Sequence, residues 1–339
     1  MKHLRSLGMA VLASLFCGAG SAQALELRFN NWMPPTHHLL TRVLQPYFAR
    51  IAEVTDGRVT VSITKSSLGG LERQYEMAAM GVADITMFSE SVTPGQFPLA
   101  EVVELPGLGE NPEAVSVAYW RTYKTFFEPV NPYREVHLLG VSSLPPYHIY
   151  NAKRPVTSIT DLQGLQLRAS GILASKKVKA LGATVIPAQI TQFLELISKG
   201  VIDGAYFTDD GVLAFGFLDT LKYKTQFEGG LGGLSTSLGI NKARWAEISP
   251  QDQAAISAIS GEELARAIGV SLNRSLADAQ GAMTKAGIQV TIADAALMGE
   301  VRQRLSSLET EWIAQANGLG VDGAGALSML KAEVAGYPQ

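Results

Sequence analysis

The sequence predicts an α/β protein of two lobes that are braced by long helices near the C-terminus. The first observation is a strand–helix–strand–helix–strand order over residues 25–88, which is typical of a parallel sheet with helices on its faces. The second is that strand and helix signals alternate again over residues 136–207. The third is that apolar residues recur at helical spacing beyond about residue 250.

The first unit has local signals for each element. Alternating apolar and polar residues indicate half-buried strands, and the turn signal Asp56-Gly57 ends the first helix. Gly81 ends the second helix. In order, the elements are strand Leu25–Phe29, helix His37–Val54, strand Arg58–Thr64, a helix that follows Gly69-Gly70 and runs to about Met80, and strand Ala83–Phe88.

The second unit repeats this logic. Ser158 and Asp161 have the spacing of a capping box, which indicates a short helical turn. We expect strands at Val136–Val141, Tyr147–Asn151, Leu165–Arg168, Ala183–Ile186 and Val201–Phe207, with helices that end at Leu181 and Lys199.

The last part of the chain is mainly helical. Leu234–Ile240 is one further strand. Ser249-Pro250 is a helix start, because serine caps the free N–H groups and proline fits the first helical position. Apolar residues then recur at helical spacing on either side of Gly287, at Ile256, Leu264, Ile268, Leu272, Leu276, Leu297, Met298, Val301, Leu305, Leu308 and Trp312.

The N-terminus has the pattern of a secretory signal peptide. Lys2 and Arg5 precede an apolar run that is too short to span a bilayer, and Ala22-Gln23-Ala24 is a small-residue cleavage pattern. We expect residues 1–24 to be removed by cleavage after Ala24. Cys17 follows the bulky Phe16, which argues against a lipoprotein site. The protein is therefore expected to be exported and soluble, without a lipid anchor.

Composition excludes several classes of protein. Hydrophobic residues make up 47% of the chain and charged residues 17%, which is typical of a globular protein. The net charge of −3 and the lack of a long basic run argue against a nucleic-acid partner. Cys17 is the only cysteine, so the exported protein would have no disulfide. We expect no stable membrane insertion.

The usual catalytic and metal-binding signatures are weak. Ser62–Lys65 matches S-x-x-K but lies in a predicted strand, whereas that chemistry needs its serine at a helix start. Adjacent His37 and His38 would point apart on a helix, which argues against zinc. Asp209-Asp210 could bind calcium, but a solvated loop or a helix N-cap is the preferred interpretation. We expect no catalytic residue, metal or cofactor.

Arg168 is the strongest candidate for binding. It lies where a predicted strand meets a helix, and open α/β sheets bind ligands at such strand ends. Its planar guanidinium matches a carboxylate with two parallel hydrogen bonds. The position of Arg168 in the sequence alone fits equally well a surface arginine or a structural ion pair. Aromatic residues also fall at strand ends, either as core or as the lining of a cleft: Trp32, Phe88, Tyr147, Tyr206 and Phe207.

The chain resembles the extracytoplasmic solute receptors of TRAP transporters, a dicarboxylate-receptor-like family. The resemblance covers nearly all of the expected mature chain and depends on the order of many short motifs. They include LRFNNWMPPTHH (27–38), TDGRV (55–59), GVAD (81–84), PGQFP (94–98), ELP (104–106), KRPV (153–156), DLQGLQLR (161–168), GVIDG (200–204) and WAEISP (245–250).

This resemblance implies a two-lobed periplasmic binding protein clamp with a long helix that spans both lobes. We expect residues 25–149 and about 236–278 in lobe I, and residues 150–235 and about 279–339 in lobe II. The family arginine of the G-x-x-x-R element matches Arg168, which implies that Arg168 pairs with a ligand carboxylate. The candidate cleft residues are Trp32, His38, Phe88, Ser89, Tyr147, Arg168 and Phe207.

Two positions depart from the family pattern. Many members have a basic residue where this chain has Tyr147, and many have asparagine where it has Phe207. Rings in place of a cation and an amide would favour an aromatic or otherwise apolar ligand, since unpaired polar groups are costly to bury. We therefore expect a monocarboxylate with an aromatic or apolar body rather than a dicarboxylate or a sugar acid.

The expected function is that of a TRAP transporter receptor, which captures a small organic acid in the periplasm. Domain closure would present the ligand to the membrane permease subunits. We expect a monomer without a cofactor. The alternatives are a ligand-sensing receptor for a membrane kinase and a periplasmic enzyme on a binding-protein fold.

Overall fold

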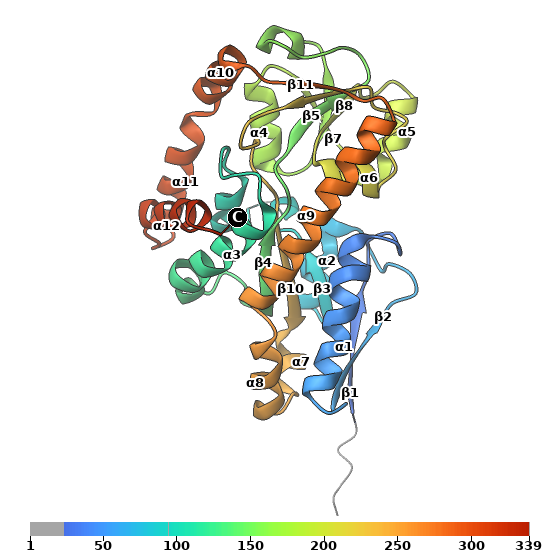
Figure 1. Ribbon diagram of the computed structural model, residues 1–339. Helices are drawn as coiled ribbons and strands as arrows, with labels where there is room; N and C mark the ends of the chain where they lie inside the picture. The colour runs from blue at the N-terminus through green and yellow to red at the C-terminus, as the bar shows by residue number, and fades with distance from the viewer. Residues whose placement is uncertain (1–23, 94, 339) are drawn as a thin grey trace, which may run out of the picture.

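The computed structural model describes residues 24–93 and 95–338. Its strands form two separate sheets, of five and six strands, and these lie in two lobes (Figure 1). We call the half that holds the five-stranded sheet the first lobe and the half that holds the six-stranded sheet the second lobe. The two-lobed α/β fold class expected from the sequence is confirmed.

The first lobe is built on the sheet β2-β1-β3-β10-β4. Its strands are β1 (Leu25–Asn30), β2 (Val59–Ile63), β3 (Ile85–Phe88), β4 (Val136–Ser143) and β10 (Ser235–Asn241). The first three strands are parallel, as the strand–helix alternation predicts. β10 comes from far along the chain and lies antiparallel between β3 and β4. All seven of its residues are buried, because strands cover both of its edges and helices cover its faces.

The helices of the first lobe begin at recognisable signals. Asn111 caps α3 by accepting hydrogen bonds from the backbone N–H groups of Glu113 and Ala114, and Ser249 caps α8 as expected. A π-helical turn at Leu40–Leu44 precedes α1. The helices are α1 (Gln45–Val54), α2 (Gln74–Ala79), α3 (Pro112–Thr122), α7 (Lys242–Ala246) and α8 (Pro250–Ala258).

The second lobe is built on the sheet β11-β9-β5-β8-β6-β7. Its strands are β5 (His148–Asn151), β6 (Gln166–Ala169), β7 (Thr184–Pro187), β8 (Gly204–Phe207), β9 (Tyr223–Gln226) and β11 (Gln289–Ile292), and its helices are α4 (Ile172–Ala180), α5 (Phe193–Ser198) and α6 (Asp209–Ala214). β6 is parallel to both β7 and β8. The capping box of Ser158 and Asp161 is confirmed.

A single long helix joins the two lobes. α9 (Glu262–Lys285) packs against α3 in the first lobe and against α6 in the second, and Figure 1 shows it crossing the boundary between them. Its apolar residues Leu264, Ile268 and Leu272 are buried, as their helical spacing predicts. The helix starts at Gly261, whose positive φ of 61° separates it from α8.

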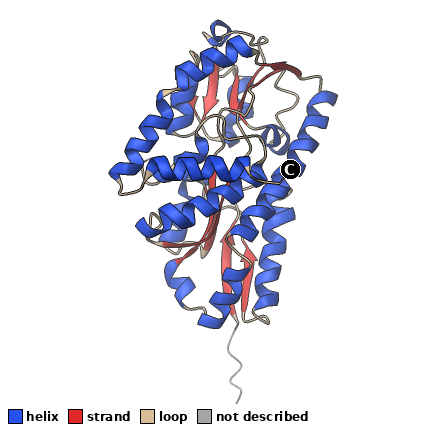
Figure 2. Cartoon of the chain, turned by 60° about the vertical axis from the view of Figure 1, so that its left-hand side comes forward, coloured by secondary structure: helices blue, strands red, loops and turns tan. Residues whose placement is uncertain are grey.

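The C-terminal helices also reach both lobes. α10 (Ala295–Leu305) packs against α4, whereas α12 (Gly323–Ala335) packs against α3. α11 (Ser307–Gly318) connects them and contacts the short helix Pro98–Glu104. Figure 2 shows this return of the chain across the molecule. The helices α3 and α12 and the strand β11 did not emerge from the sequence analysis, and the domain boundaries given there stay a prediction.

Two expectations concern the membrane. In the ranges that the structure describes, no helix is long and apolar enough to cross a bilayer. The predicted signal peptide falls on residues 1–24, and residues 1–23 lie outside the described part of the chain. The cleavage site after Ala24 therefore stays a prediction.

Candidate functional site

The side chain of Arg168 is buried at the end of β6, with only 5% of its surface exposed. Its Nε donates a hydrogen bond to the Ala188 carbonyl oxygen at 2.9 Å, and its Nη2 donates to the Ser170 hydroxyl. Burial lowers the pKa of the guanidinium to about 10, so it still carries its charge at neutral pH. Among the described residues, no carboxylate oxygen lies within 4.0 Å of it. Within the described part of the chain, Arg168 is therefore a buried cation without a directly paired counter-ion.

Arg168 lies on the wall of a cavity of about 390 Å³ that both lobes enclose. The lining is mostly apolar and aromatic, and Arg168 is the one lysine or arginine among the described residues that line it. The first lobe supplies Met87 of β3 and residues that follow β1, β2 and β3, and the second lobe supplies residues at the ends of β6 and β8, before β5 and after α6. The apolar, aromatic and basic residues of the lining include Trp32, Met33, His37, Leu39, Leu71, Met87, Val92, Tyr147, Arg168, Phe207 and Phe215. Leu144 and Leu234 come from the segments that join the lobes.

Three aromatic side chains shape the space near the cation. The Arg168 Cζ lies 5.7 Å from the centre of the Phe207 ring, a favourable cation–π distance. The Tyr147 ring stands edge-on to Phe207 at 6.2 Å and stacks on Tyr206 at 4.8 Å. The Trp32 indole N–H donates to the Met87 carbonyl oxygen at 2.9 Å, which fixes its ring at the cavity. Trp32, Tyr147, Arg168 and Phe207 are expected cleft residues from the sequence, and all four line this cavity.

Phe207 keeps its position because Gly211 leaves room for it. A Cβ atom at Gly211 would lie 2.5 Å from Cε1 of the Phe207 ring. No side chain fits at that distance without displacing the ring. The absence of a side chain in the first turn of α6 therefore sets the shape of the cavity wall.

Three other residues from the sequence analysis do not line this cavity. The Phe88 ring packs among Tyr75, Phe97 and Tyr133, away from Arg168. The buried Ser89 hydroxyl donates to the Ser235 carbonyl oxygen at 2.8 Å. His38 Nδ1 lies 3.0 Å from the Ser271 hydroxyl, behind the wall. Met87 of β3 lines the cavity, and its neighbour Phe88 points to the opposite face of the sheet because successive side chains of a strand alternate.

His37 lines the cavity in place of its neighbour His38. The two imidazole rings stack at 4.7 Å. Burial and then the neighbouring His38 lower the pKa of His37 to about 4, so that the ring is neutral at physiological pH. The backbone N–H of Leu39 donates to its Nδ1 at 3.3 Å, which places the proton on Nε2. His37 therefore adds a neutral N–H donor to the site rather than a second cation.

The interpretation of Asp209-Asp210 as a solvated loop or N-cap is wrong. Thr208 caps α6, and both carboxylates are buried. Asp209 forms a buried ion pair with Lys224 at 2.6 Å and accepts a hydrogen bond from the Tyr150 hydroxyl. Asp210 lies on the cavity wall. In the described part of the chain, no group of three or more His, Cys, Asp or Glu residues could hold a metal ion.

Some cavity residues had no signal in the sequence analysis. The local sequence offers His37 only a weak zinc pattern, and Asp210 only the pattern of a calcium ligand, a solvated loop or a helix cap. Glu72, Gln189 and Thr236 also line the cavity. Their segments are distant in the sequence and meet only because the lobes face each other.

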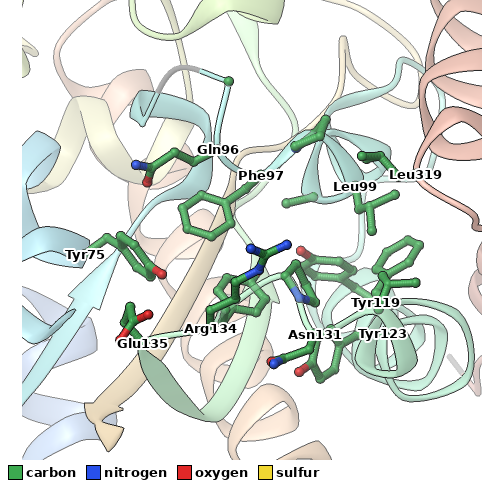
Figure 3. Close-up of a pocket in the computed structure, with 17 residues that line it drawn as sticks. Tyr75, Gln96, Phe97, Leu99, Tyr119, Tyr123, Asn131, Arg134, Glu135 and Leu319 are labelled. Atoms are coloured by element: carbon green, nitrogen blue, oxygen red, sulfur yellow. The ribbon is translucent and has the colours of Figure 1, made fainter.

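A second cavity, of about 520 Å³, lies within the first lobe (Figure 3). Tyr75, Phe97 and Tyr123 line it together with the guanidinium of Arg134. Arg134 is exposed, so water screens its charge. This cavity also lacks any contribution from the strands of the second lobe. The cavity at Arg168 is therefore the better candidate for a ligand that both lobes enclose.

Two α/β lobes around a mostly apolar cavity with one buried cation define a solute-binding protein of the two-lobed class. The chain belongs to the family described as "Bacterial extracellular solute-binding protein, family 7", whose model matches residues 29–314. The resemblance to TRAP transporter receptors is thereby confirmed.

Individual relatives share nearly the whole chain. "Outer membrane transporter protein TsaT" of Comamonas testosteroni is 30% identical over 340 residues, which cover 99% of both chains. A TRAP periplasmic solute binding protein from Bordetella bronchiseptica, solved with bound (R)-mandelate and (S)-mandelate, is 32% identical and has a TM-score of 0.89. The match covers 92% of this chain and 99% of that one.

A third relative comes from an unidentified marine microbe. It is a TRAP solute binding protein specific for aromatic acid ligands, solved with 3-hydroxybenzoate. It is 25% identical, the match covers 94% of this chain and 100% of that one, and the TM-score is 0.86.

Proposed function

We propose that this protein captures a small aromatic monocarboxylate in the periplasm and delivers it to TRAP membrane permease subunits. The observation that carries this proposal is the buried guanidinium of Arg168, which has no carboxylate partner in the described chain and lies on an aromatic cavity wall. A buried charge is costly unless it is paired. A ligand carboxylate would supply the missing partner.

The carboxylate would bind at the free edge of the guanidinium. Nε is held by the Ala188 carbonyl oxygen and Nη2 contacts Ser170, so the fork cannot rotate freely. Preorganised donors lose little conformational entropy when a carboxylate binds. Burial also strengthens the charge-assisted hydrogen bonds, because water does not compete for them.

The remainder of the cavity favours an aromatic body. Tyr147 and Phe207 stand where a flat ring could make edge-on and stacked contacts, which contribute about 0.5–1.5 kcal/mol each beyond area burial. No second lysine or arginine among the described residues lines the cavity. A second carboxylate on the ligand would therefore lack a cationic partner. The mandelate and 3-hydroxybenzoate that two relatives bind have this chemistry.

Capture would involve closure of the lobes. The ring of His37 in the first lobe packs edge-on against the ring of Phe215 in the second, with centroids 5.9 Å apart, and both residues line the cavity. A ligand in the cavity beside this pair would contact both lobes at once, which favours the closed form by differential binding. The closed form would then be the one that the permease recognises.

Isothermal titration calorimetry with a panel of acids tests the proposal. We expect mandelate, benzoate and 3-hydroxybenzoate to bind at least tenfold more tightly than succinate or glucuronate. Bound ligand recovered unchanged after long incubation would agree with a receptor rather than an enzyme. Preferred binding of succinate or glucuronate would refute the proposed ligand class.

A further inference from the structure

Lys177 of α4 is a buried cation that the proposed function does not use. Its side chain is fully buried, and its ammonium group donates hydrogen bonds to the backbone carbonyl oxygens of Glu104 at 2.7 Å and of Leu231 at 2.8 Å. Burial lowers the pKa of the ammonium group to about 8, so it keeps its charge at neutral pH. An apolar side chain would fill the same space without the cost of a buried charge, which indicates a role for the ammonium group itself.

The two hydrogen bonds join parts of the molecule that belong to different lobes. Lys177 lies in the second lobe, whereas Glu104 ends the short helix Pro98–Glu104, which packs against β10 of the first lobe. Leu231 lies between β9 and β10, where the chain crosses from the second lobe to the first. A Cβ atom on the next residue, Gly232, would clash with the Glu104 carbonyl oxygen, so the crossing segment packs tightly there. The ammonium group therefore connects α4 to the first lobe and to the segment between the lobes.

A second set of contacts leads from the ammonium group to the ligand cavity. Lys177 Nζ lies 5.2 Å from the centre of the Tyr206 ring, a favourable cation–π distance. The Tyr206 hydroxyl donates to the same Leu231 carbonyl oxygen at 2.7 Å. The Tyr206 ring stacks on the Tyr147 ring at 4.8 Å, and Tyr147 lines the cavity. Tyr206 thus contacts both the buried ammonium group and a residue of the cavity wall.

We propose that Lys177 is a positioning residue for ligand binding, which holds the Tyr206–Tyr147 ring pair in the arrangement that the bound acid requires. This inference rests on the proposed function. Lys177 is outside the cavity lining, so it acts on the ligand through these two rings. Without the ammonium group, the Glu104 carbonyl oxygen would lose a buried donor and the Tyr206 ring would lose its cation. Both rings would then be less well preorganised for an aromatic ligand.

A double-mutant cycle tests this role. Calorimetry with benzoate measures the affinities of the wild type, Lys177→Met, Tyr147→Leu and the variant with both changes. Each single change should weaken binding by about tenfold. The double variant should be weakened by about tenfold to thirtyfold, because two residues that act through one contact are not additive. A lysine that only stabilises the fold would instead give independent losses, which multiply to about a hundredfold.

Val178→Ala is the matched control. Val178 follows Lys177 in α4 and is also fully buried, but it does not line the cavity. Its truncation should lower the melting temperature and leave the affinity for benzoate unchanged. Melting temperatures also establish that each variant of the cycle is folded.

Lys177→Gln is a second variant at the same position. Glutamine keeps N–H donors on a shorter side chain without the charge, so its affinity should fall between those of the wild type and Lys177→Met. If neither variant folds, Tyr206→Leu replaces Lys177→Met in the cycle, because it removes the ring that links the ammonium group to Tyr147. Additive losses of Tyr206→Leu and Tyr147→Leu would then overturn the proposal.

The possible failures are distinguishable. If no aromatic acid binds to the wild type, the proposed function fails and this inference fails with it. If the wild type binds benzoate and a folded Lys177→Met protein binds it equally well, the role of Lys177 is overturned while the proposed function stands. Additive losses in the cycle overturn it in the same way, as does an equal loss of affinity in Val178→Ala.

Discussion

The guanidinium carbon of Arg168 lies 5.7 Å from the centre of the Phe207 ring, and both side chains are buried on the same cavity wall. The ring offers the cation a favourable face but no negative charge. Arg168 is therefore held in place, yet no described residue pairs with it directly as a counter-ion, which is the arrangement expected of a binding site for an anionic ligand.

Replacing Arg168 by methionine should separate binding from stability. Methionine fills similar space without a buried charge, and burial disfavours that charge, as the lowered pKa indicates. We expect loss of aromatic-acid binding by about a hundredfold or more, with a melting temperature equal to or above that of the wild type. Calorimetry and thermal unfolding of the ligand-free protein measure the two effects. Unchanged affinity would refute the carboxylate-binding role.

Arg168→Lys is the companion variant. Lysine keeps the charge but loses the planar fork and the hydrogen bond to the Ala188 carbonyl oxygen. Affinity should fall between those of the wild type and the methionine variant. Equal affinities of the lysine variant and the wild type would show that charge alone binds the ligand.

Replacing Phe207 by asparagine should weaken the binding of aromatic acids. The ring contacts Tyr147, Phe215 and the guanidinium of Arg168, and its loss removes about 1.5–3 kcal/mol of apolar burial. Part of that loss destabilises the fold, and part lowers the affinity by about tenfold. Titration with benzoate measures the second part.

Phe193→Leu provides the control for this variant. Phe193 is fully buried and packs on Phe217 but does not line the cavity. The Phe193→Leu protein should have a lower melting temperature than the wild type but the same affinity for benzoate. If both variants lowered the affinity equally, loosening of the second lobe rather than loss of the Phe207 ring would explain the effect.

Gly211→Ala tests whether the cavity shape depends on the missing side chain. The new Cβ would lie 2.5 Å from the Phe207 ring, so the ring must move. We expect a destabilisation of about 1–3 kcal/mol together with weaker binding. Chemical denaturation and calorimetry measure these effects.

Gly281→Ala is the matched control, because Gly281 lies in α9 and an added Cβ meets no atom within 4 Å. It should raise the stability by about 0.5–1 kcal/mol, since alanine is the better helix former. Binding should not change. A destabilised Gly281 variant would contradict this account of the helix.

His148 should make stability dependent on pH. Burial, and then the charge of Lys224, lowers the pKa of its imidazole to about 4, below the usual value of about 6.5 in the unfolded chain. A lowered pKa stabilises the folded state above pH 6.5, and this stabilisation is lost as the pH falls towards 4. His148→Gln lacks this titration.

The stability difference between the wild type and His148→Gln should therefore become less favourable to the wild type by about 2 kcal/mol between pH 7.5 and pH 5. Urea unfolding at the two pH values measures it. A difference that does not change with pH would mean that His148 titrates normally in the folded protein.

Much of the fold was predictable from local patterns. These patterns act within a few residues: apolar and polar residues alternate along β1 and β2, Ser249 caps α8, and Ser158 begins a capping box. The position of Arg168 at a strand end was predictable for the same reason. By contrast, β11 pairs with the distant β9, and three of its four residues are exposed, so its sequence has no strong strand pattern.

The candidate site was predictable only in part. Trp32 follows β1, Tyr147 directly precedes β5 and Phe207 ends β8, and residues at strand ends gather at the edges of a sheet. Phe88 also ends a strand, but it packs on the opposite face with Tyr75. The strand end alone does not tell which face a side chain takes when both faces of the sheet are buried.

The amino-acid order sufficed for the succession of strands and helices, for the two-lobed class and for the candidacy of Arg168, because propensity, capping and alternation depend on neighbouring residues. The tertiary structure was needed to show that no described residue pairs directly with Arg168 as a counter-ion and that Asp210 and His37 line the same cavity. Such facts depend on contacts between segments far apart in the chain. Burial, the unpaired oxygen of Asp210 and the lowered pKa of His37 all follow from those contacts.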